Sequence, residues 1–271
     1  MNTKNGQKSR YSSEYYYQFC SIVSEEYLAK ALTLYYSLEK KAVNFHIWFC
    51  VMDKKAYEVL QKMKLKNATL ISVEDIEGKN IEALGIKEGR SLKEYCWTLK
   101  PAVIEYVMDN FHTERLIYCD ADVCFSFDPN VIYKDWDTYS CFMCMPRNLE
   151  DTQYMHGLYQ SELLGFKNDH YGRDILSWWK NQCFNWCFDY FDAANERWGD
   201  QRYLIYVPRL FENIKLCENL EINAASWNII KRPIKKALKN IKKYDKNYAN
   251  KYFKQDVNSK NYKNLEMMYI G

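Results

Sequence analysis

The sequence is poor in glycine, proline and histidine, and it lacks the motifs of several common enzyme classes. Its 271 residues include 9 Gly, 5 Pro and 4 His. It contains no Gly-x-Gly-x-x-Gly, no phosphate loop ending in Gly-Lys-Ser/Thr, no His-Glu-x-x-His and no Gly-x-Ser-x-Gly. The sequence therefore does not favour a dinucleotide-dependent oxidoreductase, a P-loop ATPase, a zincin or a serine hydrolase.

Long apolar runs are also missing. No window approaches the roughly 20 apolar residues that span a bilayer, and no signal-type apolar stretch follows the first ten residues. The 10 cysteines are scattered through apolar runs such as 116–119, which is typical of small buried hydrophobic residues rather than of a disulfide framework. These features predict a cytoplasmic protein that is neither exported by this route nor transmembrane.

Charge is distributed unevenly along the chain. The net charge is +3, but residues 231–271 hold twelve Lys or Arg against three Asp or Glu, which gives +9 there and −6 for residues 1–230. Apolar residues also recur at helical spacing among the lysines of 230–263. This basic amphipathic tail predicts peripheral binding to an anionic membrane at the inner face of the plasma membrane. Its apolar stripe could instead pack on the body or on a second subunit. No nucleic-acid partner is expected, because the body lacks a basic groove.

The first half alternates β-rich runs with amphipathic helical stretches, the pattern of βαβ units around a parallel sheet. We predict strands over 16–23, 45–52, 68–73 and 116–119, and helices over 27–40, 54–63 and 92–108. Residues 74–92 are predicted to form a loop with about one helical turn, and Pro101 is expected to break or kink the last helix. The second half is less regular, with predicted strands over 139–145, 158–166 and 214–217 and a helix over 171–188. The fold class is therefore α/β.

Two aspartates follow the apolar strand 116–119. In the run LIYCDADVCF, residues 116–125, the strand leads directly into Asp120 and Asp122. Ligands of open parallel sheets bind beyond the carboxyl ends of the strands. Mn²⁺ or Mg²⁺ prefers carboxylate and phosphate oxygens, so this pair could hold the metal of a diphosphate-containing ligand. An Asp-x-Asp alone is weak evidence, since about one is expected by chance in a chain of this size.

Several ordered segments carry a resemblance to a known family. They are FCSIV at 19–23, RSLKEYCWTLKP at 90–101, YCDADVCF at 118–125, WW at 178–179, GDQRYL at 199–204 and NAASWNI at 223–229. In this order they resemble the GT-A glycosyltransferases, especially bacterial surface-polysaccharide transferases and glycogenin-like enzymes. The resemblance implies a GT-A fold, with a Rossmann-like, mostly parallel sheet flanked by helices, a mixed acceptor-side half and a basic C-terminal helical tail. Residues 1–230 would form the glycosyltransferase domain, with a nucleotide-sugar half at about 15–125 and an acceptor half at 126–230.

The resemblance also implies roles for individual residues. Asp120 and Asp122 would hold the metal, and Asp200 and Gln201 would lie beside the reacting sugar as catalytic residues. Donor binding is assigned to Cys20, Ser21, Tyr27, Arg90, Lys93, Asp120, Ala121, Asp122 and Asn223. Many relatives complete the metal site with a C-terminal histidine, whereas the last histidine here is His170. The third metal ligand therefore stays open between Asp200, Asn223 and water.

The predicted activity is metal-dependent transfer of a hexose from a nucleotide-diphosphate sugar, UDP-linked, to a hydroxyl of a surface or lipid-linked glycan, with retention of configuration. One alternative is a sugar-nucleotide pyrophosphorylase-like nucleotidyltransferase, which should have a glycine-rich loop where this chain has SEEYLAK at 24–30. Another is a non-catalytic glycan-binding protein on the same fold. Plainer interpretations also exist, in which Asp200 caps a helix starting at Gln201 and Arg90 and Lys93 are solvated surface residues.

Overall fold

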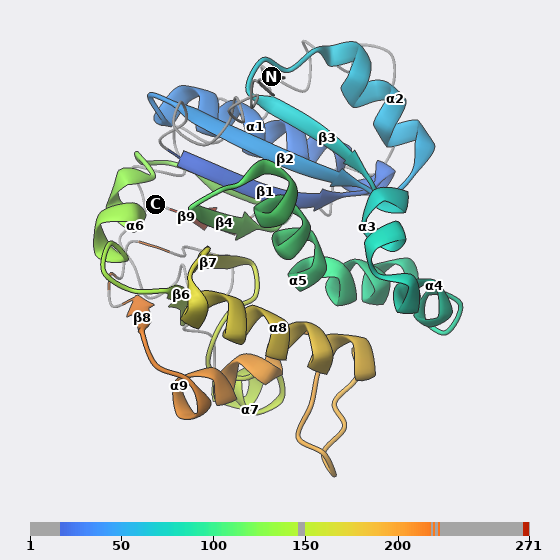
Figure 1. Ribbon diagram of the computed structural model, residues 1–271, viewed down its shortest axis with the longest axis vertical. Helices are drawn as coiled ribbons and strands as arrows, with labels where there is room; N and C mark the ends of the chain where they lie inside the picture. Colours follow the sequence, from blue (N-terminus) through green and yellow to red (C-terminus); the bar gives the residue numbers. More distant parts are fainter. Residues whose placement is uncertain (1–16, 146–149, 218, 220–221, 223–267, 271) are drawn as a thin grey trace, which may run out of the picture.

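A seven-stranded sheet in the order β3-β2-β1-β4-β7-β6-β8 organises the chain in this computed structural model (Figure 1). The structure describes residues 17–145, 150–217, 219, 222 and 268–270. The strands are β1 Tyr17–Val23, β2 Phe45–Val51, β3 Ala68–Ser72, β4 Arg115–Cys119, β6 Cys141–Cys144, β7 Leu163–Lys167 and β8 Ile214–Cys217. Strands β1 to β4 pair in parallel, β7 runs antiparallel to both β4 and β6, and β8 is parallel to β6. The predicted α/β fold, parallel in its first half and mixed in its second, is confirmed.

A small second sheet lies beside the first. It pairs β5 Val123–Phe125 in parallel with β9 Met268–Ile270. Strand β5 directly follows the aspartate pair, so the last described residues of the chain lie next to that loop.

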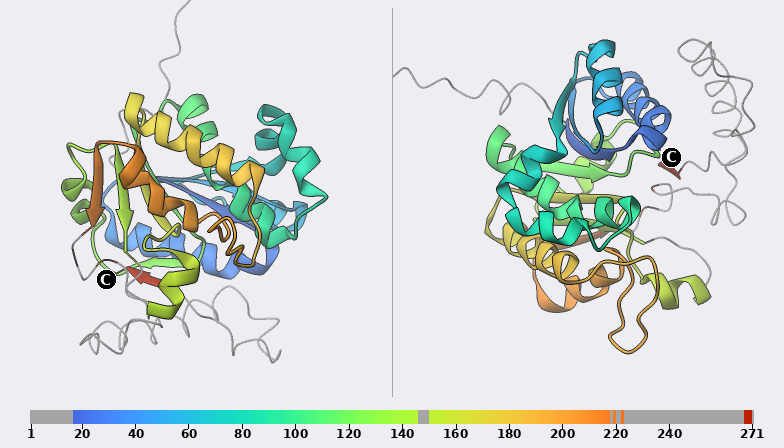
Figure 2. Two further views of the ribbon diagram at one scale, coloured as in Figure 1. Left: turned by 90° about the horizontal axis from the view of Figure 1, so that it is seen from below. Right: turned by 90° about the vertical axis from the view of Figure 1, so that its right-hand side faces the viewer.

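Helices cover both faces of the large sheet. They are α1 Leu28–Lys41, α2 Lys54–Met63, α3 Val73–Lys79, α4 Ile81–Lys87, α5 Leu92–Phe111, α6 Asn130–Asp135, α7 Glu150–His156, α8 His170–Asn185 and α9 Val207–Leu210, with 3₁₀ helices at Glu25–Tyr27 and Arg202–Tyr206. Figures 1 and 2 show α1 and α2 on one side of the first three strands and α5 with α8 on the other.

The burial pattern follows from the two-residue period of the strands. Phe19 of β1 and Ile117 of β4 pack in the cluster shared with α1 and α2, whereas Cys20 and Tyr118 pack in the cluster shared with α5 and α8. All seven residues of β1 and all seven of β2 are buried. Strands buried on both faces read as continuous apolar runs, which is why the sequence predicts them well.

Two predictions about the 74–108 region were wrong. The expected loop over 74–92 contains α3 and α4, because Ser72 and Asp75 form a capping box that starts α3. The predicted helix over 92–108 is confirmed as α5, but this helix spans 20 residues in all and is not broken at Pro101 as expected. Its buried face, which includes Pro101 itself and packs against β1 and α8, outweighs the cost of the lost hydrogen bond.

The elements predicted in the second half are present with shifted boundaries, but helices α6, α7 and α9 were not predicted. Strand β7 covers 163–167 instead of 158–166, whereas β8 spans the predicted 214–217. Helix α8 starts one residue early because Asp169 Oδ1 accepts a hydrogen bond from Gly172 N at 2.8 Å. The predicted tail helix at 230–263 lies outside the described residues. No helix in the described ranges combines the length and apolarity needed to cross a membrane.

Candidate active site

The aspartate pair lies at the carboxyl end of β4, in a tight turn. The Asp120 amide donates to Glu162 O at 2.9 Å, and the Val123 amide donates back to Asp120 O at 3.0 Å. Tyr118 Oη donates to Asp120 Oδ1 at 2.7 Å. The side chains of Asp120 and Asp122 remain 23% and 25% exposed, so both carboxylates are accessible to a ligand.

The two carboxylates contact lysines from opposite faces of the sheet. Lys30 of α1 places Nζ 3.4 Å from Asp122 Oδ2 and 4.4 Å from the centre of the Tyr27 ring. Burial raises the pKa of Asp122, and the nearby charge of Asp120 raises it further. The structure thus brings Tyr27, a predicted donor-binding residue, to the aspartate pair together with Lys30, which the sequence did not single out.

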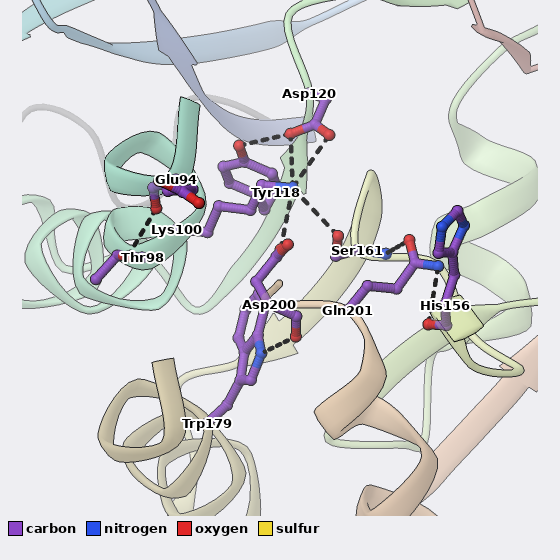
Figure 3. A network of polar contacts seen from close by, with 10 residues as sticks. All are labelled: Glu94, Thr98, Lys100, Tyr118, Asp120, His156, Ser161, Trp179, Asp200 and Gln201. Carbon is purple, nitrogen blue, oxygen red and sulfur yellow. Dashed lines mark hydrogen bonds and ion pairs between the residues drawn. The ribbon is translucent and has the colours of Figure 1, made fainter. Parts of the chain in front are cut away.

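Lys100 of α5 links Asp120 to Asp200 (Figure 3). Its Nζ lies 3.1 Å from both carboxylate oxygens of Asp120 and 3.1 Å from Asp200 Oδ2. A third partner is Ser161 Oγ at 3.2 Å, and the lysine side chain is 3% exposed. Burial alone would lower the pKa of Lys100, but the carboxylates of Asp120 and Asp200 outweigh it and raise that pKa. The ammonium is therefore charged at neutral pH.

Asp200 and Gln201 are buried and held by their neighbours. Trp179 Nε1 donates to Asp200 O at 2.9 Å. The Gln201 side chain donates to His156 O at 3.2 Å and accepts from Ser161 N at 3.5 Å. The 3₁₀ helix that follows begins at Arg202 with Gln201, not Asp200, at its N-cap position. The structure thus places the Asp-Gln pair beside the aspartate pair, with Lys100 between them.

Glu162 adds a carboxylate that no sequence motif signals. It precedes β7, and its Oε2 atom is buried without a hydrogen-bond partner among the described residues. Burial, followed by the charge of Asp120, raises the pKa of Glu162 to about 8. Lys100 did leave a signal in the sequence, because it is a single cation within the apolar helical run LKPAVI.

Other predicted donor-binding residues lie elsewhere. The Arg90 guanidinium donates to the carbonyl oxygens of Cys183 and Phe184, both at 2.9 Å, at the C-terminal end of α8. Lys93 pairs with Asp189 at 2.7 Å and lies over the Trp97 ring at 4.7 Å. In the part of the chain that the structure describes, neither side chain forms a hydrogen bond or ion pair with Asp120 or Asp122.

The other predicted donor-binding residues that the structure describes have buried side chains. Cys20 and Ser21 are fully buried within β1, and Ala121, between the two aspartates, is 3% exposed. Asn223 lies outside the described residues.

The donor set fits a hard divalent cation that also takes ligands from its substrate. Both available side chains of the pair are carboxylates and both are partly exposed. Within the described residues, no three His, Cys, Asp or Glu side chains form a cage that could hold a metal. Mg²⁺-type ions are commonly held by one or two carboxylates, with phosphate and water oxygens completing the shell. Asp120 and Asp122 would hold such an ion.

Sequence comparison identifies relatives that share most of their length with this chain. The uncharacterized protein YfnF of Bacillus subtilis (strain 168) is 33% identical over 221 residues, which cover 78% of this chain and 71% of YfnF. The chain belongs to the YfnF family. The uncharacterized protein YfnD of the same organism is 29% identical over 217 residues, covering 79% of this chain and 69% of YfnD. No protein-family model matches the sequence.

Solved structures place this YfnF-family chain in the GT-A glycosyltransferase fold. Mouse xyloside xylosyltransferase 1 superposes with a TM-score of 0.51 at 12% identity, covering 81% of this chain and 91% of that one. The galactosyltransferase LgtC, solved with donor and acceptor sugar analogs, superposes with a TM-score of 0.53 at 14% identity and covers 76% and 74% of the two chains. The GT-A resemblance inferred from the ordered sequence segments is confirmed at the level of fold.

Proposed function

We propose that this YfnF-family protein is a metal-dependent glycosyltransferase that transfers a hexose from a UDP-sugar to a hydroxyl of a surface or lipid-linked glycan. The observation that carries the proposal is the position of Asp120 and Asp122, which lie partly exposed at the carboxyl end of β4 within a GT-A fold. That is the edge at which open sheets bind nucleotides.

The residues divide the work between donor binding and transfer. Asp120 and Asp122 would hold a divalent cation, which would supply positive charge to balance the developing negative charge on the leaving nucleotide. Tyr27, close to Asp122, offers an aromatic face on the nucleotide side. Asp200 and Gln201 lie across Lys100 from Asp120, where we place the reacting sugar and the acceptor hydroxyl. We also propose that transfer retains the anomeric configuration.

A nucleotidyltransferase is the main enzymatic alternative. It would act on a nucleoside triphosphate and a sugar phosphate, and would release pyrophosphate. The turn after β1 favours the glycosyltransferase, because residues 24–30 form a 3₁₀ turn and the start of α1 instead of a glycine-rich phosphate loop. A glycan-binding protein without activity would bind sugars independently of a nucleotide.

A binding screen tests the proposal directly. UDP-, GDP-, ADP- and dTDP-linked sugars are titrated into the protein by calorimetry, with and without Mn²⁺. We expect the UDP-sugars to bind with Mn²⁺ and to lose at least about tenfold in affinity without it. Slow release of UDP from the bound donor would then establish turnover. Failure of every nucleotide sugar to bind, or release of pyrophosphate from a nucleoside triphosphate, would overturn the proposal.

The tail belongs to the same proposal. A net charge of +9 over residues 231–271 supports peripheral binding to an anionic membrane, close to a lipid-linked acceptor. Co-sedimentation with phosphatidylserine vesicles at low salt should decrease when residues 231–267 are deleted. Equal sedimentation of both proteins would exclude the membrane role.

A further inference from the structure

Lys100 is a buried lysine at the centre of the candidate active site, and its burial is energetically unfavourable unless it has charged partners. Lysine is among the residues least often buried without a partner, and removing an ammonium from water costs several kcal/mol. The Lys100 side chain is nevertheless 3% exposed and lies on the sheet-facing side of α5. Its neighbours in the helix, Leu99 and Pro101, are buried apolar residues. Packing alone would be served better by an apolar side chain at this position.

The partners of Lys100 come from three separate parts of the chain. Asp120 follows β4, Ser161 precedes β7, and Asp200 precedes the 3₁₀ helix Arg202–Tyr206. All three contacts lie between 3.1 and 3.2 Å. Figure 3 shows the ammonium at the meeting point of these segments, with the Asp120 carboxylate on one side and the Asp200 carboxylate on the other. One cation therefore holds one carboxylate from each half of the site.

The contacts of Asp120 and Asp200 explain why this cation matters for orientation. The Asp200 carboxylate is buried, and its charged partner among the described residues is Lys100, whose Nζ lies 3.1 Å from Oδ2, with the Ser161 side chain as a further hydrogen-bonding neighbour. Asp120 is held on one side by Tyr118 Oη and on the other by Lys100. Without the ammonium, two carboxylates would face each other across a buried space and repel.

We propose that Lys100 is the positioning residue of this site, orienting Asp120 for donor binding and Asp200 for sugar transfer. The inference rests on the proposed glycosyltransferase function. Because the ammonium is buried, it acts through the two carboxylates and does not itself contact the donor.

The proposal predicts a kinetic signature that differs from those of its partners. Loss of Asp122 should weaken donor binding, and loss of Asp200 should slow turnover. Lys100→Met should do both, because it releases a carboxylate on each side. We expect at least about a tenfold loss of Mn²⁺-dependent UDP affinity and at least about a hundredfold loss of UDP release from the donor.

Non-additivity provides a readout that a general packing defect would not give. If Asp200 is oriented by Lys100, Asp200→Asn should slow turnover strongly in the unaltered protein but by less than about threefold in Lys100→Met. Lys62→Met, at an exposed position on α2, is the matched control and should leave UDP affinity and turnover unchanged. Melting temperatures verify that each variant is folded.

Lys100→Met could fail to fold, because it leaves two carboxylates without their counter-ion. In that case the double variant Lys100→Met with Asp200→Asn tests the proposal. It removes the ammonium together with the charge of Asp200, which is more buried than Asp120. This protein should bind UDP and Mn²⁺ at least about tenfold more weakly than Asp200→Asn alone. Equal UDP affinity in the two proteins would overturn the role of Lys100.

The outcomes separate the inference from the function on which it rests. If the unaltered protein binds none of UDP, GDP, ADP or dTDP with Mn²⁺, the proposed function is overturned, and the inference with it. If it binds UDP normally and Lys100→Met retains both affinity and turnover, only the inference is overturned. Fully additive effects of Lys100→Met and Asp200→Asn on turnover would likewise exclude coupling through Lys100.

Discussion

Lys30 Nζ lies 3.4 Å from Asp122 Oδ2, so the second aspartate of the pair already has a positive partner on the α1 side of the sheet. Both side chains are mostly buried, at 15% and 25% exposed, which keeps their interaction stronger than that of a surface ion pair. A divalent cation at Asp122 must share that carboxylate with the lysine.

Replacing Lys30 with Gln should therefore strengthen metal binding. We expect Mn²⁺ affinity, measured in the presence of saturating UDP, to rise about three- to tenfold, because a competing positive charge is removed. Electron paramagnetic resonance of free Mn²⁺ provides the measurement. Lys54→Gln is the control, since the Lys54 side chain is 91% exposed and its nearest acidic partner is Glu58 at 4.0 Å. Unchanged or weaker Mn²⁺ affinity in Lys30→Gln would show that Lys30 does not compete with the metal for the Asp122 carboxylate.

Asp122→Asn should leave the fold nearly intact and abolish metal-dependent donor binding. The amide keeps the size of the side chain but removes the charge that attracts the cation. Calorimetric titration of UDP with and without Mn²⁺ measures the effect, and thermal unfolding confirms that the protein is folded. Mn²⁺-dependent affinity equal to that of the unaltered protein would refute the metal assignment.

Asp200→Asn should change UDP affinity by less than about threefold. It should slow the release of UDP from the donor by about a hundredfold or more, because we place this carboxylate at the reacting sugar. The measurement pairs UDP affinity with the steady-state rate of UDP release from the donor. A rate equal to that of the unaltered protein would mean that Asp200 is only structural.

Two glycines should respond in opposite directions to replacement by alanine. A Cβ on Gly172, at the start of α8, would lie 2.2 Å from the carbonyl oxygen of Lys167, so the backbone must move. We expect Gly172→Ala to reduce the free energy of unfolding by about 2–3 kcal/mol. Gly85 in α4 has nothing within 4 Å of its added Cβ, and Gly85→Ala should add up to about 1 kcal/mol. Urea unfolding of both variants checks the pair, and equal effects would contradict this steric argument.

His46 should make the fold sensitive to acid. Burial lowers the pKa of His46 to about 4, and its Nε2 lies 2.8 Å from Thr69 Oγ1. Because the folded-state pKa is below the usual value of 6.5, the neutral ring contributes stability above pH 6.5, and this is lost as the pH falls towards 4. The loss at pH 4.5 relative to pH 7 should be about 2–3 kcal/mol smaller in His46→Phe than in the unaltered protein. Urea unfolding at both pH values provides the measurement, and identical losses would exclude this role of His46.

The sequence predicted the parts of the molecule that depend on local patterns. Strands buried on both faces, such as β1 and β2, read as continuous apolar runs, and the aspartates after β4 followed from their position at the end of such a run. Helix α5 was predicted over 92–108, but its continuation through Pro101 without a break was not, because tertiary packing overrode a local preference.

The contacts of Lys100 and Glu162 were not predictable from local patterns. Lys100 meets Asp200, 100 residues further along the chain, and Glu162 meets Asp120 through the pairing of β4 with β7. Such contacts depend on how distant segments are brought together, which spacing and composition do not encode. The ordered family-like segments supplied the approximate location of the site but not these partners.

The position of β7 constrains how the protein can be made. Strand β4, which leads into the aspartates, has β1 on one side, but its other neighbour is β7, about 50 residues later in the chain. The amide of Asp120 is itself held by the carbonyl of Glu162, just before β7. During synthesis from the N-terminus, the first three strands can pair early, yet the turn that bears Asp120 lacks this partner until residues 162–167 have left the ribosome. The turn that bears Asp120 therefore acquires this partner only after most of the sheet has been synthesised, and a fragment of residues 15–125 would lack both β7 and the Glu162 carbonyl that holds the Asp120 amide.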